Sequence, residues 1–189
     1  MVKFGTPNFI GIYDDALSSS QCKELISEFE KSSLMEGVVN IDGVTKIDPS
    51  VKKCIQLKDP NLLKESIITN IIKDALGSCL EKYKKEYISL EHQALWHVDE
   101  EYSFKRFKTE DDGFKKWHTE HGSGKDSMRI LVWQFYLNNA QAGTEFMHFP
   151  TIRAKMGRCI VWPAGWSHTH RSEPNKGLKY IVSGWCSFH

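Results

Sequence analysis

The spacing of apolar residues changes near residue 90 of this 189-residue chain, and the change limits the folds that the chain can adopt. Before residue 90 the apolar residues recur at helical spacing, and after it they alternate or form short runs, as they do in β-strands. Helices followed by strands predict an α+β fold with the helices packed on one face of a sheet. A chain of this length fits a single domain, 1–189, with helical support over 1–88 and a strand-rich core over 89–189.

The first helix is predicted to follow the serines at 18–20. Ser18 and Gln21 have capping-box spacing, and four apolar residues then fall on one helical face: Cys22, Leu25, Ile26 and Phe29. A second helical pattern runs from Leu62 to Tyr87. Gly77 is a weak point in it, so one long helix and two shorter helices are both compatible with the pattern.

Strand-like patterns occupy most of the remaining chain. Short β-prone runs at 9–13 and 51–57 precede the main series, in which strands are expected near 90–98, 102–108, 113–120, 129–138, 143–149, 157–163 and 178–187. The stretch 129–138 is apolar on both faces. This is expected of a sheet that helices cover on the outside and that lines a pocket on the inside.

The composition is that of a globular protein without a general attraction for charged polymers. A formal net charge of +1 gives no reason to expect nucleic acid or an anionic membrane as a partner. Five cysteines without Cys-x-x-Cys spacing suggest neither a disulfide framework nor a cysteine-rich zinc site. The first residues contain no apolar signal-peptide core, and no stretch approaches the roughly 18 apolar residues of a membrane span, so we expect a cytoplasmic location.

A possible metal site begins in the stretch 117–121, Trp-His-Thr-Glu-His. In an extended strand His118 and Glu120 lie on one face and Thr119 on the other, so His118 and Glu120 can bind one ion. Two histidines and one carboxylate on one face of a metal leave the opposite positions open, which is the ligand set of non-haem Fe(II) oxygenases. An isolated His-x-Glu pair is more often an ordinary strand end, so the interpretation depends on a second histidine elsewhere.

The stretch 167–170, Ser-His-Thr-His, offers two candidates for that histidine. His168 and His170 share a strand face, so their alternation does not choose between them. Lys179 follows His170 by nine positions, a spacing that suits an acidic co-substrate, and this register favours His170.

These motifs resemble the prolyl 4-hydroxylase-like branch of the 2-oxoglutarate and Fe(II)-dependent oxygenases, over roughly the C-terminal half of the chain. The resemblance rests on His118-x-Glu120, Tyr136-Leu137-Asn138, Gly157-Arg158 and the segment from His170 to Trp185. It implies a double-stranded β-helix, the jelly-roll core shared with cupins. The family pattern of a histidine, three residues and a proline is met by His170 and Pro174. Most relatives have Asp where this chain has Glu120, whose carboxylate arm is one methylene longer.

The resemblance also implies the roles of individual residues. His118, Glu120 and His170 would bind Fe(II), with 2-oxoglutarate and O₂ as co-substrates and ascorbate as the reductant. After Gly177, alternation places Lys179 and Ser183 on one strand face, where they could meet the distal carboxylate of 2-oxoglutarate. Tyr136 would donate a hydrogen bond to the same carboxylate.

The implied reaction is hydroxylation of an unactivated C–H bond, with release of succinate and CO₂, and the first candidate substrate is a peptidyl proline or another protein side chain. Four aromatic residues could stack on an extended peptide: Tyr102, Trp117, Trp166 and Trp185. Five lysines near the first ligands would favour an acidic partner, unless they form an ordinary solvated face: Lys105, Lys108, Lys115, Lys116 and Lys125.

Three alternatives remain open at this point. The chain could hydroxylate a free amino acid or another small molecule, or it could be a non-catalytic cupin-like module that binds a metal. A zinc enzyme with three histidines, His118, His121 and a later one, would leave Lys179 without a role. The sequence does not indicate an oligomeric state.

Overall fold

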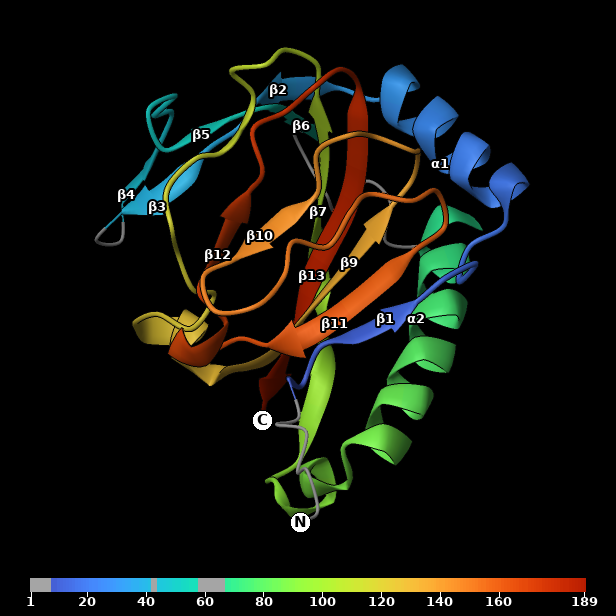
Figure 1. The fold of residues 1–189 in the computed structure, drawn as a ribbon, viewed down its shortest axis with the longest axis vertical. Coiled ribbons are helices and arrows are strands. Elements are labelled where there is room, and N and C mark those ends of the chain that lie inside the picture. Colours follow the sequence, from blue (N-terminus) through green and yellow to red (C-terminus); the bar gives the residue numbers. More distant parts are fainter. Residues whose placement is uncertain (1–7, 42–43, 58–66) are drawn as a thin grey trace.

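In the computed structural model, which describes residues 8–41, 44–57 and 67–189, a seven-stranded antiparallel sheet forms the centre of the molecule (Figure 1). Its strand order is β1-β11-β9-β13-β7-β6-β2. The strands span β1 Gly11–Tyr13, β2 Leu34–Glu36, β6 Ile55–Leu57, β7 Trp96–Phe107, β9 Arg129–Tyr136, β11 Cys159–Pro163 and β13 Lys179–Phe188.

Shorter elements surround this sheet. Three pairs of strands lie outside it: β3 (Val39–Ile41) with β4 (Val44–Lys46), β5 (Lys52–Lys53) with β8 (Gly113–Phe114), and β10 (Thr144–Phe146) with β12 (His170–Ser172). The helices are α1 (Ser19–Lys31) and α2 (Ile67–Glu86), with 3₁₀ turns η2 (Ile88–His92), η3 (Gly124–Met128) and η4 (Trp166–His168). Figure 1 shows both α-helices along one side of the sheet and the β10–β12 pair on the other.

Strand β9 shows how the sheet separates two hydrophobic clusters. Its side chains alternate, so that Leu131, Trp133 and Phe135 pack toward the helices, while Val132 and Tyr136 pack toward β10 and β12. Buried residues of α1 and α2 complete the first cluster. The structure is therefore α+β with the helices on one sheet face, as the change in apolar spacing predicts.

The two helices follow their sequence patterns closely. Ser18 caps α1, its hydroxyl accepts a hydrogen bond from the Gln21 amide, and the Gln21 side chain accepts one from the Ser18 amide. Three of the four predicted face residues of α1 are fully buried: Cys22, Leu25 and Phe29. Helix α2 continues through Gly77 without a break. The predicted start of that second helix, 62–66, lies outside the described residues.

The structure corrects several strand predictions. The segments expected at 90–98 and 102–108 form one continuous strand, β7, preceded by the 3₁₀ turn η2. Of the strand expected at 113–120, Gly113–Phe114 forms the short strand β8, and His118 forms an isolated antiparallel bridge to His170 of β12. Strands β1, β2 and β6 come from the N-terminal part of the chain and still belong to the central sheet. The sheet is therefore not confined to residues 89–189, the strand-rich core that the sequence pattern predicts.

The Gly157-Arg158 motif joins the N-terminal segment to the sheet. Gly157 has a positive φ of 79°, and its missing side chain lets the Leu17 backbone approach, with the Leu17 amide donating to the Gly157 carbonyl at 3.1 Å. Arg158 donates to both carboxylate oxygens of Asp14, at 2.6 and 3.2 Å. This pairing holds the end of β1 beside β11.

Among the described helices, none combines the length and apolar character needed to cross a membrane.

Candidate metal centre

Two distant chain segments are held together by backbone hydrogen bonds at the site. The His118 amide donates to the His170 carbonyl at 3.0 Å, and the His170 amide donates to the His118 carbonyl at 2.9 Å. The Glu120 amide donates to the Ala164 carbonyl at 3.1 Å. These bonds fix the loop that carries His118 and Glu120 against the start of β12, although the loop is not itself a regular strand.

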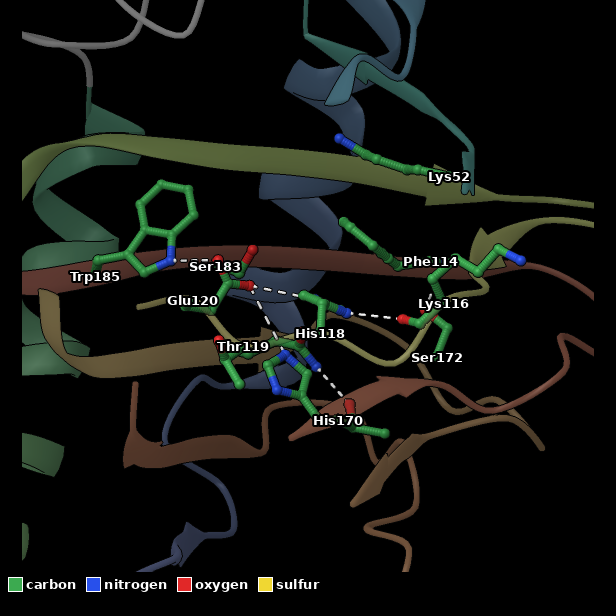
Figure 2. A network of polar contacts seen from close by, with 12 residues as sticks. Lys52, Phe114, Lys116, His118, Thr119, Glu120, His170, Ser172, Ser183 and Trp185 are labelled. Atoms are coloured by element: carbon green, nitrogen blue, oxygen red, sulfur yellow. Dashed lines mark hydrogen bonds and ion pairs between the residues drawn. The ribbon is translucent and has the colours of Figure 1, made fainter. Parts of the chain in front are cut away.

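Three side chains converge there as the sequence predicts, and we call them the metal trio. The candidate ligand atoms of His118, Glu120 and His170 all lie within 4.8 Å of one another. Glu120 Oε1 is 3.5 Å from His118 Nε2 and 3.7 Å from His170 Nε2 (Figure 2).

Each imidazole of the metal trio is oriented by its other nitrogen. His118 Nδ1 lies 3.0 Å from the Lys116 carbonyl, and His170 Nδ1 lies 3.0 Å from the His168 carbonyl. A carbonyl accepts, so each Nδ1 carries a proton and each Nε2 is the nitrogen that faces the centre. The Phe114 ring stacks on His118 with 3.7 Å between centroids, which limits rotation of that ring.

The longer arm of Glu120 is fixed by its second carboxylate oxygen. The Trp185 indole donates to Glu120 Oε2 at 3.0 Å, and the Arg129 guanidinium lies 3.6 Å from the same oxygen. Arg129 also stacks over the Trp185 ring, 3.8 Å from its centroid. With Oε2 engaged, Oε1 alone faces the two histidines, as Figure 2 shows. The extra methylene relative to Asp is therefore accommodated by side chains specific to this site.

The protonation states suit a metal. Burial alone would raise the pKa of Glu120, but the neighbouring His118 and His170 outweigh burial and hold the pKa well below its usual range. Burial lowers the pKa of His170. An ionised carboxylate and a neutral imidazole are the forms that bind a divalent cation. The donor set, with two nitrogens and one oxygen, fits Fe(II).

The two competing histidines lie outside the metal trio. His168 is buried in η4, where its Nε2 lies 2.8 Å from the Asn8 carbonyl and its Nδ1 lies 2.9 Å from the Ser167 hydroxyl. His168 therefore does not share a strand face with His170. His121 is exposed and has no place in the metal trio. The three-histidine arrangement is not formed.

The trio lines a narrow cavity of about 50 Å³ that continues into a groove of about 600 Å³. Of the three residues predicted to bind 2-oxoglutarate, Ser183 lines this cavity directly. Tyr136 lies behind the cavity wall. Its hydroxyl is 2.6 Å from the hydroxyl of Thr144, which lines the cavity. Lys179 lies behind Phe107, another wall residue, with its ammonium 4.8 Å from the ring centroid.

Lys179 has the properties of an anion-binding residue. Its side chain is 2% exposed, and burial lowers its pKa to about 8. Within the described part of the chain its ammonium has no hydrogen bond or ion pair, and the Phe107 ring is its cation–π contact. A buried cation of this kind requires an anion for full stabilisation.

Three residues of the cavity wall could not be identified as site residues from the sequence. Thr144 joins Tyr136 to Gln134, whose amide donates to the Thr144 hydroxyl at 3.2 Å. Lys52 and Lys105 also line the cavity. Lys105 was visible in the sequence as one of five clustered lysines, whereas Lys52 and Thr144 carried no signal.

The four aromatic residues proposed for peptide stacking have separate environments. Tyr102 is buried in the helix-side cluster and is a core residue that cannot stack on a peptide there. Trp117 lies against the Arg171 guanidinium, Trp166 is 82% exposed, and Trp185 holds Glu120. Trp117 and Trp166 thus remain available at the surface.

No protein-family model matches this sequence, and no curated protein matches it closely enough to be identified as a relative. Solved structures do match. A prolyl hydroxylase from Trichoplax adhaerens, in complex with a peptide fragment of the hypoxia inducible factor oxygen degradation domain, aligns with a TM-score of 0.70 at 12% identity, over 95% of this chain and 84% of that one. The viral collagen prolyl hydroxylase of Paramecium Bursaria Chlorella virus-1, in its 2-oxoglutarate complex, aligns with a TM-score of 0.61 at 15% identity over 100% of both chains.

A third match comes from a different reaction class. The non-haem, α-ketoglutarate-dependent epimerase SnoN of nogalamycin biosynthesis aligns with a TM-score of 0.64 at 10% identity, over 95% of this chain and 77% of that one. At these identities the similarity establishes the fold. The chain has the jelly-roll fold of prolyl hydroxylases and other 2-oxoglutarate and Fe(II) oxygenases, as its sequence motifs predict.

Proposed function

We propose that this protein is an oxygenase that uses Fe(II), 2-oxoglutarate and O₂ to hydroxylate an unactivated C–H bond. The observation that carries this proposal is the convergence of His118, Glu120 and His170 on one point within this fold. The buried, unpaired ammonium of Lys179 adds support, because a dicarboxylate bound in the same barrel would supply its counter-ion.

The residues of the chain have distinct tasks in this proposal. His118, Glu120 and His170 would hold the iron through two nitrogens and one oxygen. When bound, iron and 2-oxoglutarate would supply the oxidant that removes a hydrogen atom from the substrate, with succinate and CO₂ as co-products. Trp185 and the two backbone carbonyls keep the ligands oriented.

The cavity wall has a second task, which is to bind the far end of the co-substrate. Lys179 would meet the distal carboxylate with its charge, and Tyr136 would contribute through its contact with Thr144. Ser183 currently accepts a hydrogen bond from Lys105 at 3.0 Å and remains a candidate for the same carboxylate. The apolar wall residues Val132, Trp162 and Ile181 exclude water from the reacting centre.

A peptidyl proline or another protein side chain is the first candidate for the substrate. The metal trio opens on a groove of about 600 Å³ rather than on a closed chamber, and the Trichoplax prolyl hydroxylase of the same fold holds a peptide. A small-molecule substrate is the second candidate, which the match to an epimerase of a biosynthetic pathway favours.

Ascorbate as the reductant and a cytoplasmic location are further parts of the proposal. They are testable by omission of ascorbate and by cell fractionation.

The test is a mass-spectrometric search for products. The protein would be incubated with Fe(II), 2-oxoglutarate and ascorbate in the presence of proline-containing peptides or a metabolite extract, and species that gain one oxygen would be identified. Succinate should form with the wild-type protein and not with His170→Ala. Binding of metal and 2-oxoglutarate without any succinate above the His170→Ala background would identify a non-catalytic module instead.

A further inference from the structure

We propose that Lys52 and Lys105 form a second anion site beside the metal trio, and that this site binds a carboxylate group of the substrate. The proposal rests on the proposed function, because it assigns the substrate class of the same centre. Both lysines line the cavity that holds the metal trio and the groove that continues from it. Figure 2 places Lys52 on the side of His118 that is away from His170.

Both ammonium groups are held by neutral partners only. Lys52 is 7% exposed, and its ammonium donates to the Val38 carbonyl at 2.9 Å and to the Gln56 side chain at 2.8 Å. Lys105 donates to the Ser183 hydroxyl at 3.0 Å. Across the residues that the structure describes, no carboxylate forms an ion pair with either lysine. Two cations therefore face one cavity without an ion pair, and the Glu120 carboxylate of the same cavity acts on both lysines only through longer-range attraction.

The other cations around the groove are paired. Arg171 lies 2.6 Å from a Glu145 carboxylate oxygen. The Arg129 guanidinium is 3.0 Å from Asp126, and Lys125 is 3.4 Å from Glu101. Lys52 is buried and Lys105 is partly buried. Because burial of an unpaired charge is unfavourable, two unpaired lysines at one site indicate that a ligand supplies the missing anion.

In the proposed function, neither Glu120 nor the co-substrate supplies that anion. Glu120 is the only acidic residue of the described cavity wall, and its two oxygens are engaged by the histidines and by Trp185. Of the two carboxylates of 2-oxoglutarate, one would belong to the metal and the other to Lys179. Lys52 and Lys105 are then left for a third carboxylate, which the substrate must carry.

This assignment narrows the substrate class. An uncharged prolyl peptide would leave both lysines unpaired next to the reacting centre, whereas a carboxylate would pair with them through charge-assisted hydrogen bonds. The carboxylate can come from a free acid or from an acidic side chain in a peptide. The shared chemistry is an anionic group held within the groove while a nearby C–H bond faces the metal trio.

The site can be probed with acetate, in protein loaded with Mn(II) and 2-oxoglutarate, because the paramagnetic ion relaxes the carbons of any acetate bound near it. We expect saturable relaxation of ¹³C-acetate in the wild-type protein and a loss of at least about fivefold in Lys105→Met and in Lys52→Met. Lys105→Arg, which keeps the charge, should retain most of the effect. Lys125→Met, which removes a paired lysine at the rim of the groove, is the matched control and should leave it unchanged.

Two results would overturn the assignment. The first is equal relaxation in the wild-type protein and in the Lys52→Met/Lys105→Met double variant. The second is a loss of 2-oxoglutarate affinity in Lys105→Met that exceeds its loss of acetate affinity, because Lys105 would then serve the co-substrate. Circular dichroism and Mn(II) affinity of each variant, compared with Lys105→Arg, separate a local effect from misfolding.

The source of the carboxylate can be identified by displacement of acetate. L-Glutamate would be compared with L-glutamine, and an acetylated, amidated Ala-Glu-Ala peptide with its Ala-Gln-Ala counterpart. Displacement by only the acidic member of one pair identifies a free acid or an acidic peptide, and equal displacement by both members refutes a requirement for charge. If 2-oxoglutarate does not bind at all, the proposed function fails, and the acetate measurement with Mn(II) alone still tests the anion site.

Discussion

His168 and His170 lie two residues apart and have different environments, which gives a direct test of the metal ligands. His170→Ala should abolish Mn(II) and Fe(II) binding, because it removes one of three donors. His168→Ala should leave metal binding intact and lower the free energy of unfolding by about 1 to 3 kcal/mol, since the Asn8 carbonyl loses a buried partner. Isothermal titration with Mn(II) and urea unfolding measure the two effects. The reverse pattern would assign the ligand to His168.

Glu120 is expected to depend on Trp185 for its orientation. Trp185→Phe removes the donor to Oε2 and should weaken metal binding by about 10- to 100-fold. Glu120→Asp keeps the charge with a shorter reach and should bind metal more weakly than the wild-type protein but better than Glu120→Ala. Metal affinity measured anaerobically for the three variants checks this order. Unchanged affinity in Trp185→Phe would show that the carboxylate is oriented by Arg129 or by the metal itself.

Lys179 should make the binding of 2-oxoglutarate dependent on pH. The carboxylate binds the ammonium form, and burial lowers the pKa of Lys179 to about 8 in the ligand-free protein. Affinity should therefore be constant below that pH and should fall by roughly tenfold per unit above it. Lys179→Met should bind 2-oxoglutarate at least about tenfold more weakly and without this pH dependence. Titration calorimetry of the Mn(II)-loaded protein measures both effects.

The effect of Lys179 on folding has the opposite sign. Because its pKa in the folded protein lies below the ordinary lysine value, the unfolded chain binds more protons between the two values. The contribution of Lys179 to the stability of the ligand-free protein therefore rises as the pH increases from about 8 toward the ordinary lysine pKa.

A pH-independent affinity for 2-oxoglutarate in the wild-type protein would contradict the assignment of Lys179 to the distal carboxylate.

The sequence could identify residues that lie within a few positions of each other, or that stand at a fixed spacing from another site residue. His118 and Glu120 stand two positions apart, and the distance from His170 to Lys179 selects His170. Lys105 could not be distinguished from a solvated lysine, because charged residues surround it in sequence. Its partial burial depends on the pairing of β7 with β13 on one side and with β6 on the other.

At the scale of elements, α2 contains a replaceable glycine. Gly77 lies in mid-helix, and a Cβ at this position would have no heavy atom within 4 Å. Gly77→Ala should raise the free energy of unfolding by about 0.5 to 1 kcal/mol, because alanine loses less backbone entropy in a helix. Urea denaturation measures the change. Gly184→Ala, whose Cβ would overlap the Trp133 ring, is the contrasting control and should destabilise the protein.

Elements that depend on neighbouring residues were predicted more accurately than those that depend on distant ones. The start of α1 follows from Ser18 and Gln21 alone, and the structure shows both hydrogen bonds of the capping box. The loop 115–120 has a strand-like sequence, yet it is placed by a few backbone hydrogen bonds to Val51, Ala164 and His170, each more than forty residues away in sequence. Spacing within the loop cannot show how much of it has a strand partner.

At the scale of the whole molecule, the jelly roll was predicted from the motifs through resemblance, whereas the strand order was not predictable. Periodicity identifies which segments are strands and which faces are apolar, but it does not state which strands are neighbours. Strands β1 and β6 were visible only as short β-prone runs. Their positions at opposite sides of the sheet come from pairing with β11 and β7.

The position of β13 between β7 and β9 has a consequence for synthesis of the protein on the ribosome. The two strands that β13 separates are made first, and they cannot join the sheet in their final positions until Lys179–Phe188 has left the exit tunnel. The central sheet should therefore close only after β13 has been synthesised and has emerged, and the metal trio, whose loop faces this sheet, should assemble with it. Nascent chains stalled before residue 179 are expected to be sensitive to protease and unable to retain Mn(II), while chains extended by a linker beyond Phe188 should acquire both properties together.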